Sequence, residues 1–312
     1  MPKLDALKIS LFCLCLILVA SGGVIFAQNL ADKTEEVLVG SKIEVPSNNA
    51  EVAGIQKYVY PPTPRGMPLP FLSARSALVI DLTTESILFQ KFPDLKLPIA
   101  STTKIMTALV AIEHFEPNVP LRSNLGAGIV GSRVGLIQGE TLTFKSLLYG
   151  MLLNSGNDAA FTIAENYPGG IPGFVMAMNK KTADLGLTNT HFENPAGFDS
   201  PNHYSSASDL AVITTEALKH PDLSKTFATK ETEILSIDKS HGHKLTNLNK
   251  LLTSVTGVMG VKTGFTDIAK ENLVGLVERD GHRVLTVVLG SDDRFGETTQ
   301  LIEWTYQNFT WR

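Results

Sequence analysis

Two hairpin patterns at opposite ends of the chain constrain the fold more than any other feature. Residues 76–91 and 272–289 each contain two mainly apolar runs around a short polar turn, and the second turn contains Asp280-Gly281. Asp-Gly between such runs is a strong hairpin signal. Helical patterns separate the two hairpins, so we expect one sheet assembled from distant segments. The sequence predicts an α+β domain: an antiparallel sheet built from N- and C-terminal segments, with flanking helices and an inserted helical region.

The helical patterns are long enough to cover such a sheet. The 312 residues, 43% of them hydrophobic, allow one large or two modest domains. The predicted helical regions are 97–112, where a turn leads into the helix, 142–167, 171–187 and 297–309. A short strand within residues 51–60 remains open.

Ser101-Thr-Thr-Lys104 stands at the start of an almost wholly apolar helix. Residues three apart share one helix face, so the Ser101 hydroxyl and the Lys104 amine are expected side by side. The helix macrodipole disfavours a charged lysine in the first turn, and burial adds to that effect. A neutral amine can accept a proton from a hydroxyl, so the pair is a candidate nucleophile and base. Ser236-Ile-Asp-Lys239 repeats the spacing in a β-like stretch, where residues three apart face opposite sides.

Two later motifs raise the specificity of this interpretation. Asn154-Ser-Gly-Asn157 interrupts a helical region with a polar loop that contains Ser155. Lys262-Thr263-Gly264 precedes the late hairpin, where an edge strand is expected. Ser-x-x-Lys, Ser-Asp-Asn and Lys-Thr-Gly form the signature of penicillin-binding proteins and class A β-lactamases. All three occur here in that order, with glycine in the middle of the second motif. Together the motifs predict acyl transfer through a serine ester.

The flanking sequence resembles low-molecular-mass D-alanyl-D-alanine carboxypeptidases of serine peptidase family S11. The resemblance runs from about Ser76 to Trp311, and its segments are 131–140, 153–160, 178–179, 192–198 and 203–209. It implies the fold shared by DD-peptidases and β-lactamases. It also implies a serine-type enzyme that removes the terminal D-alanine from peptidoglycan stem peptides, with β-lactam antibiotics as covalent inhibitors and no cofactor or metal.

The resemblance assigns roles to the motif residues. Ser101 would attack the carbonyl between two D-alanines with Lys104 as proton acceptor, although the identity of the acylation base is left open. Ser155 could relay the proton to the leaving amine, and Asn157 could hold Lys104 and the substrate amide. The remaining implied site residues are Lys262, Thr263 and Arg294 for the terminal carboxylate, Gly264 in the pairing strand, and the backbone N–H groups of Ser101 and Phe265 as oxyanion hole.

The chain departs from the family pattern at three places. Lys270 and Glu271 stand where the family usually has glycine and an aromatic or small residue, and Ala196 stands where some members have histidine. The chain also stops at Arg312, so we expect no room for the C-terminal β-domain and amphipathic anchor that many members have. We expect His203 to be a hydrogen-bonding structural residue rather than a base.

The N-terminus predicts export. Residues 9–27 are uncharged, which suits a membrane anchor or a cleaved signal, so residues 1–27 are a signal or anchor and the protein acts in the cell envelope, outside the cytoplasm. Residues 28–70 are expected to form a tether and 71–312 the peptidase domain. Both cysteines, Cys13 and Cys15, lie in the apolar run, which excludes disulfides and thiol chemistry from the exported part.

Other functions fit less well. The net charge of −4 without a long basic run disfavours nucleic acid as a partner. The glycine pattern at 126–131 lacks the context of a dinucleotide site, and His241-Gly-His243 lacks a third metal ligand. A β-lactamase would need a Glu-x-x-Leu-Asn loop that residues 194–209 do not contain. A D,D-endopeptidase and a catalytically inactive wall-binding protein remain as alternatives.

Overall fold

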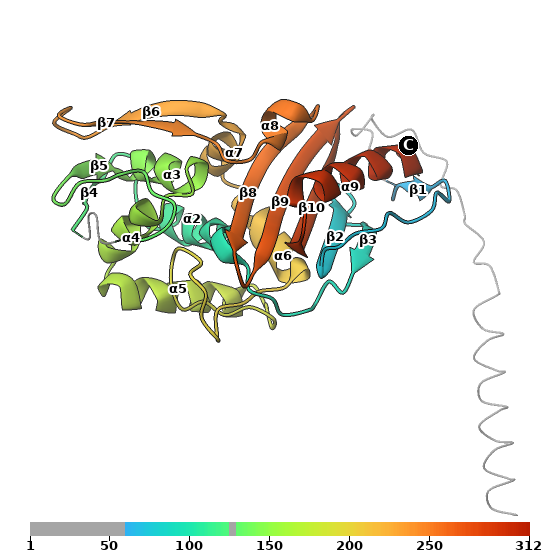
Figure 1. Ribbon diagram of the computed structural model, residues 1–312, viewed down its shortest axis with the longest axis horizontal. Helices are drawn as coiled ribbons and strands as arrows, with labels where there is room; N and C mark the ends of the chain where they lie inside the picture. Colours follow the sequence, from blue (N-terminus) through green and yellow to red (C-terminus); the bar gives the residue numbers. More distant parts are fainter. Residues whose placement is uncertain (1–59, 125–128) are drawn as a thin grey trace, which may run out of the picture. The chain divides into compact units, whose positions relative to one another are not determined.

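The central sheet joins the two ends of the chain, as the hairpin patterns predict. The structure is a computed structural model that describes residues 60–124 and 129–312. In it, five antiparallel strands follow the order β3-β2-β10-β9-β8. The strands are β2 (Ser76–Asp81), β3 (Ile87–Lys91), β8 (Val258–Thr266), β9 (Lys270–Arg279) and β10 (His282–Ser291). β10 pairs with β2 from Val284 opposite Asp81 to Leu289 opposite Ser76, which is the long-range contact that closes the domain (Figure 1).

The expected helical regions contain helices with shifted ends, and among the described residues three further helices, between residues 207 and 254, form where the sequence analysis predicted none. They are η1 (Ala100–Thr103, a 3₁₀ turn), α2 (Lys104–Ile112), α3 (Phe144–Leu153), α4 (Asn157–Glu165), α5 (Gly170–Asp184), α6 (Ala207–Ala217), α7 (Pro221–Ala228), α8 (Leu251–Ser254) and α9 (Arg294–Asn308). The pattern at 142–167 therefore contains two helices. α9 begins three residues earlier than expected because the Asp293 side chain accepts the Gly296 N–H and caps it.

In the described part of the chain, three small strand pairs lie outside the central sheet. They are β4 (Pro120–Arg122) with β5 (Thr141–Thr143), β6 (Glu231–Leu235) with β7 (Gly242–Thr246), and β1 (Thr63–Pro64) with β11 (Phe309–Thr310). The expectation that Ser236–Lys239 continues a strand is wrong at this point. β6 ends at Leu235, and Ser236 turns its hydroxyl to Asp238 Oδ1 at 2.7 Å in the hairpin turn.

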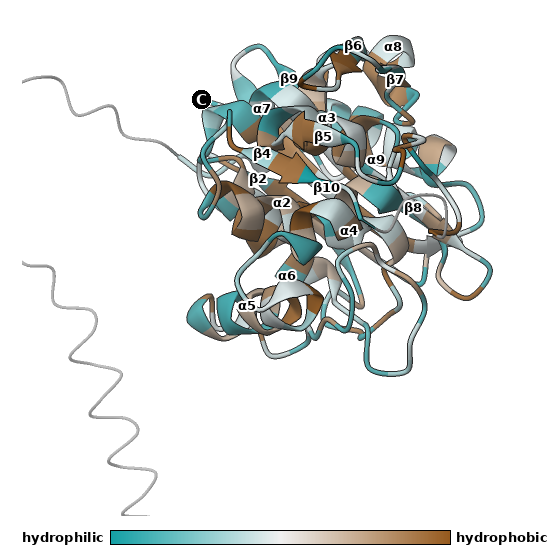
Figure 2. Ribbon diagram, turned by 90° about the vertical axis from the view of Figure 1, so that its left-hand side faces the viewer, coloured by the Kyte–Doolittle hydropathy of each residue, from teal (hydrophilic) through white to brown (hydrophobic). Residues whose placement is uncertain are grey.

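The sheet is buried on both faces, which explains why its strands are almost continuously apolar. Alternate residues of β10 face opposite cores: Val284 and Val288 pack with α9, whereas Leu285, Val287 and Leu289 join the larger core with α2 and α6. Figure 1 shows α9 along one face of the sheet, and Figure 2 shows hydrophobic segments on the central elements and also on the outlying β6–β7 pair.

Residues 60–70, which the sequence places in the tether, contact the C-terminal part of the domain. The Trp304 indole donates to the Pro68 carbonyl at 2.8 Å, and β1 pairs with β11. The expected signal or anchor at 1–27 and residues 28–59 of the expected tether at 28–70 lie outside the described residues. They include the apolar run, both cysteines and the open strand at 51–60 except its last residue. Within residues 60–124 and 129–312, no helix has both the length and the apolar character needed to cross a bilayer.

Candidate active site

Ser101 lies on a tight turn that two neighbouring glycines allow. Ala100 has a φ of +47°, a region that residues with a Cβ seldom adopt. A Cβ on Gly197 would overlap the Ala100 carbonyl oxygen, and one on Gly264 would lie 3.1 Å from Ser101 N. Strained backbone held in place by close packing is typical of functional sites. The turn therefore holds Ser101 between β8 and the loop at residues 194–198.

Lys104 contacts two of the other predicted catalytic residues, Ser101 and Asn157, but has no hydrogen bond to Ser155. Its side chain is 0% exposed, and its Nζ lies 2.9 Å from Ser101 Oγ, 2.8 Å from Asn157 Oδ1 and 2.6 Å from the Ala196 carbonyl oxygen. Asn157 Nδ2 donates to the Val130 carbonyl at 2.7 Å, which orients Oδ1 toward the lysine. The two oxygens of Asn157 and Ala196 can only accept, so they take both hydrogens of a neutral amine. The lone pair then faces the Ser101 hydroxyl.

The protonation of Lys104 suits that arrangement. Burial lowers the pKa of the amine well below its ordinary value, the nearby charge of Lys262 lowers it further, and Asp158 opposes both effects. A lowered pKa favours the neutral form of the amine. The geometry and the electrostatics together allow Lys104 to take the proton of Ser101.

The loop at 194–198 supplies a contact that the sequence analysis missed. The Asn194 side-chain oxygen accepts the backbone N–H groups of residues 196–198 at 3.2, 2.8 and 3.0 Å. Thr107 of α2 donates to the Pro195 carbonyl at 2.7 Å. These bonds fix the loop so that the Ala196 carbonyl reaches Lys104. Asn-Pro-x-Gly is a turn composition visible in the sequence, but the target of the carbonyl is not.

His203 has the structural position that we expected. Its Nε2 lies 2.8 Å from Thr103 Oγ1, and its Nδ1 accepts the Glu193 N–H at 3.1 Å. Burial lowers the pKa of His203 to about 4, with Glu193 opposing the shift and His191 and Lys104 adding to it. The neutral imidazole thus connects Thr103, just before α2, to the backbone of Glu193, just before the loop at 194–198.

This buried histidine predicts a loss of stability in acid. Between pH 6.5 and about 4 the unfolded chain binds a proton at His203 that the folded chain does not, so stability falls as pH falls through this window. The contribution is at most about 3 kcal/mol. Thermal unfolding from pH 7.5 to 4.5 should show a shallower pH dependence in His203→Gln than in the wild type. His241→Gln, at an exposed position, is the control. If the pH dependence of the melting temperature were the same in His203→Gln, His241→Gln and the wild type, His203 would not be the buried group that destabilises the fold in acid.

The loop before α4 places Ser155 and Asn157. Ser155 has a φ of +57° and is buried, and within the described part of the chain no group hydrogen-bonds to its hydroxyl. A Cβ on Gly156 would lie 2.7 Å from Val134 Cγ2, which explains glycine in the centre of this motif. The Asp158 carboxylate accepts the N–H groups of residues 134–136 at 2.8–3.0 Å and ties that loop to α4. Sequence reasoning missed Asp158, although it directly follows the motif.

β8 is an edge strand of the described sheet and carries the third motif. Lys262 and Thr263 are buried, at 2% and 4% exposure, whereas Phe265 is 55% exposed. Gly264 is the point at which the strand passes the Ser101 turn, because a side chain there would meet the backbone of Ile99 and Ser101 and the Cβ of Ala100. Burial lowers the pKa of Lys262 to about 7, and the charge of Arg294 adds to the effect.

Arg294 lies beside this strand at the start of α9. Its Nη1 donates to the Gly264 carbonyl at 2.9 Å, and its guanidinium stacks on the neighbouring Phe295 ring. Glu271, one of the departures from the family pattern, accepts the Arg294 backbone N–H at 2.9 Å and so positions the helix start. Lys270, the other departure on this strand, is exposed at the start of β9 with a φ of +58°. The buried Lys262 and the half-buried Arg294 therefore make this end of the site positively charged.

The pattern His241-Gly-His243 does not form a metal centre with other described residues. No group of three or more His, Cys, Asp or Glu side chains that could hold a metal ion occurs in residues 60–124 and 129–312. His243 Nε2 instead contacts Glu140 Oε1 at 2.8 Å, and His241 Nδ1 contacts Ser240. Part of the glycine pattern at 126–131 lies outside the described residues.

Comparisons with known proteins agree with these features. A family model described as D-alanyl-D-alanine carboxypeptidase (Peptidase_S11) matches residues 65–293. D-alanyl-D-alanine carboxypeptidase DacF of Bacillus subtilis is 35% identical over 245 residues, which cover 76% of this chain. The chain spans 63% of the length of that relative. A D-alanyl-D-alanine endopeptidase of Pseudomonas aeruginosa is 35% identical over 257 residues, covering 78% of this chain and 81% of the relative.

A solved structure shows the same fold. The Streptomyces K15 DD-transpeptidase superposes with a TM-score of 0.73 at 29% identity, over 77% of this chain and 100% of that one. The shared fold is the one that the sequence resemblance implies.

Proposed function

The chain belongs to the D-alanyl-D-alanine carboxypeptidase family, and we propose that it cleaves the terminal D-alanine from peptidoglycan stem peptides through an ester on Ser101. The observation that carries the proposal is the environment of Lys104 Nζ, where two acceptor oxygens leave the amine lone pair for the Ser101 hydroxyl. A buried hydroxyl–amine pair of this kind is the activated nucleophile that acyl transfer requires.

The proposed reaction has two halves. Ser101 Oγ gives its proton to Lys104 and attacks the carbonyl between the two D-alanines. The resulting oxyanion is held by the backbone N–H groups of Ser101 and Phe265, which the close passage of Gly264 brings together. Ser155 relays the proton to the leaving amine, and C-terminal D-alanine departs. Water then attacks the ester, and Ser101 regains its proton as the shortened peptide leaves.

The substrate lies along the free edge of β8. An extended peptide adds to such an edge through backbone hydrogen bonds. Its terminal carboxylate binds Lys262 and Thr263, with Arg294 as a second cationic contact. Asn157 holds the substrate amide in addition to Lys104.

The proposal is tested with a diacetylated Lys-D-Ala-D-Ala tripeptide and the purified protein. Mass spectrometry should detect the loss of one alanine, and preincubation with benzylpenicillin should prevent it, because the antibiotic acylates the same serine. An intact tripeptide, in a sample that melts cooperatively, would overturn the carboxypeptidase assignment.

Endopeptidase activity on cross-linked stem peptides is the second candidate. It is favoured by relatives from P. aeruginosa and Escherichia coli that are named D-alanyl-D-alanine endopeptidase, at 35% and 32% identity. The same residues would perform both reactions, so the shape of the substrate-binding groove determines which substrate is cleaved. Cleavage of a purified cross-linked dimer, with an intact tripeptide, would favour this second function.

The protonation of Lys262 sets the alkaline limit of the proposed reaction. Its pKa of about 7 in the free protein means that the ammonium is lost as pH rises above 7. Because the ammonium binds the substrate carboxylate, kcat/KM should fall by up to about tenfold per pH unit above this value. Lys262→Arg keeps its charge, so the fall should move to higher pH, whereas Lys270→Arg should behave like the wild type. If kcat/KM of Lys262→Arg fell at the same alkaline pH as that of the wild type, Lys262 would not be the group that sets the alkaline limit.

We also propose that residues 9–27 attach the protein to the outer side of the cytoplasmic membrane. The support is the uncharged run of 19 residues. The tether, expected at 28–70, would then comprise residues 28–59, because residues 63–68 contact the peptidase domain. Deleting residues 1–27 should release the protein from membranes and leave tripeptide hydrolysis unchanged, and retention on membranes would overturn the proposal.

A further inference from the structure

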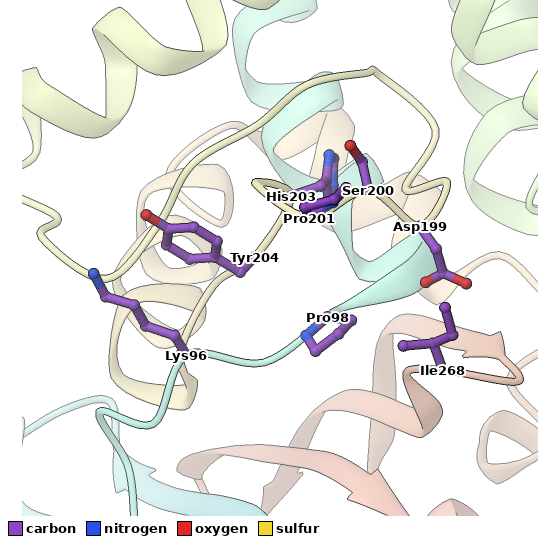
Figure 3. A pocket seen from close by; sticks show the side chains of 8 residues that line it. All are labelled: Lys96, Pro98, Asp199, Ser200, Pro201, His203, Tyr204 and Ile268. Carbon is purple, nitrogen blue, oxygen red and sulfur yellow. The ribbon is translucent and has the colours of Figure 1, made fainter.

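A pocket of about 460 Å³ lies beside the end of β8. Three segments that also build the active site form its walls, as Figure 3 shows. Lys96 and Pro98 precede Ser101, Asp199 and Tyr204 follow the loop that contacts Lys104, and Ile268 belongs to the β8–β9 turn. None of these side chains has a role in the proposed bond cleavage.

The pocket lies on the path of the acyl side of the substrate. In the proposed function the terminal carboxylate is at Lys262 and Thr263, and the scissile carbonyl is at Ser101, beside Gly264. The preceding residues of an extended peptide must then run past Thr266, because each residue advances about 3.3 Å along the strand. Thr266 Oγ1 donates to Asp199 Oδ1 at 2.8 Å, which joins the strand end to the pocket wall.

The pocket has charges of opposite sign at its two ends and an apolar middle. Figure 3 places Asp199 and Ile268 at one end, Pro98 in the middle, and Lys96 with Tyr204 at the other end. Asp199 is exposed and uses one oxygen for Thr266, so the second oxygen is free for a cation. The Lys96 ammonium lies 5.1 Å from the centre of the Tyr204 ring, and no carboxylate in the described ranges pairs with it.

We propose that this pocket binds the acyl-side part of the stem peptide, an inference that rests on the proposed function. The residue before the two D-alanines carries an ammonium group that contacts Asp199. The next residue away from the scissile bond carries a free carboxylate that contacts Lys96. The apolar stems of the two residues lie across Pro98 and Ile268. The pocket thereby selects a peptide with a cation near the cleavage point and an anion farther from it.

Four synthetic substrates and two variants test the charges separately. The parent peptide is acetyl-γ-D-Glu-Lys-D-Ala-D-Ala. One analogue has the free α-carboxylate of the glutamyl residue converted to an amide, one has the lysine side chain acetylated, and one has both changes. The measured quantity is kcat/KM for release of D-alanine. In the wild type each neutralisation should lower kcat/KM about two- to fivefold, the range for ion pairs near a surface.

The variants assign each effect to one side chain. Lys96→Met should remove the discrimination between carboxylate and amide but keep that between ammonium and acetyl-lysine, and Asp199→Asn should do the reverse. Lys145→Met and Asp280→Asn, at exposed positions on other elements, should retain both. Equal discrimination in the wild type and in the pocket variants would overturn the proposal, as would no discrimination in the wild type. If no substrate released D-alanine, the proposed function itself would have failed.

Discussion

Replacing Ser101 by alanine should abolish covalent labelling by a fluorescent penicillin and lower tripeptide hydrolysis by roughly 10⁶-fold, the size of effect expected for removal of a serine nucleophile. The physical reason is that Ser101 Oγ lies 2.9 Å from the buried amine of Lys104. No other hydroxyl in the described part of the chain has a hydrogen bond to this amine. The labelling is followed by gel fluorescence and the location of the adduct by peptide mass spectrometry.

Ser236→Ala is the matched control. Ser236 belongs to the second Ser-x-x-Lys of the chain, but its hydroxyl contacts Asp238 in a hairpin turn and Lys239 is exposed. Labelling and hydrolysis should therefore equal those of the wild type. Retained labelling of Ser101→Ala, or its loss in Ser236→Ala, would refute the assignment of the nucleophile.

Replacing Lys104 by methionine should slow acylation by about 10²–10⁴-fold, the range for a lost general base. Methionine fills a similar volume but cannot accept the Ser101 proton. It also leaves Asn157 Oδ1 and the Ala196 carbonyl without their donor, which should cost roughly 1–3 kcal/mol for each buried acceptor. Stopped-flow acylation by a chromogenic cephalosporin measures the rate, and calorimetry measures the stability.

The pH profile separates a lost base from a damaged fold. In the wild type, acylation should fall in acid as the Lys104 amine becomes protonated. That acidic limb should disappear in Lys104→Met, provided that the variant melts cooperatively above the assay temperature. A variant that is equally slow but keeps the acidic limb would show that another group is the base.

Much of the fold was predictable because it rests on local patterns. The Asp280-Gly281 turn between apolar runs predicted the β9–β10 hairpin, and the pairing of β10 with β2 confirmed that distant segments share one sheet. The ends of elements were less predictable. The side chain of Asp293 moved the start of α9 toward the N-terminus, and the turn at Ser236 ended a strand that the composition would extend.

The sequence by itself determined which residue types could perform acyl transfer and the order of the three motifs. The helical spacing of Ser101 and Lys104 brings two reactive groups together without any long-range contact. The tertiary structure decided which groups control that pair. The Ala196 carbonyl, the orientation of Asn157 through Val130 and the passage of Gly264 beside Ser101 all join residues more than 25 positions apart. Such contacts depend on how the loops pack, and local patterns in a single sequence carry no record of that packing.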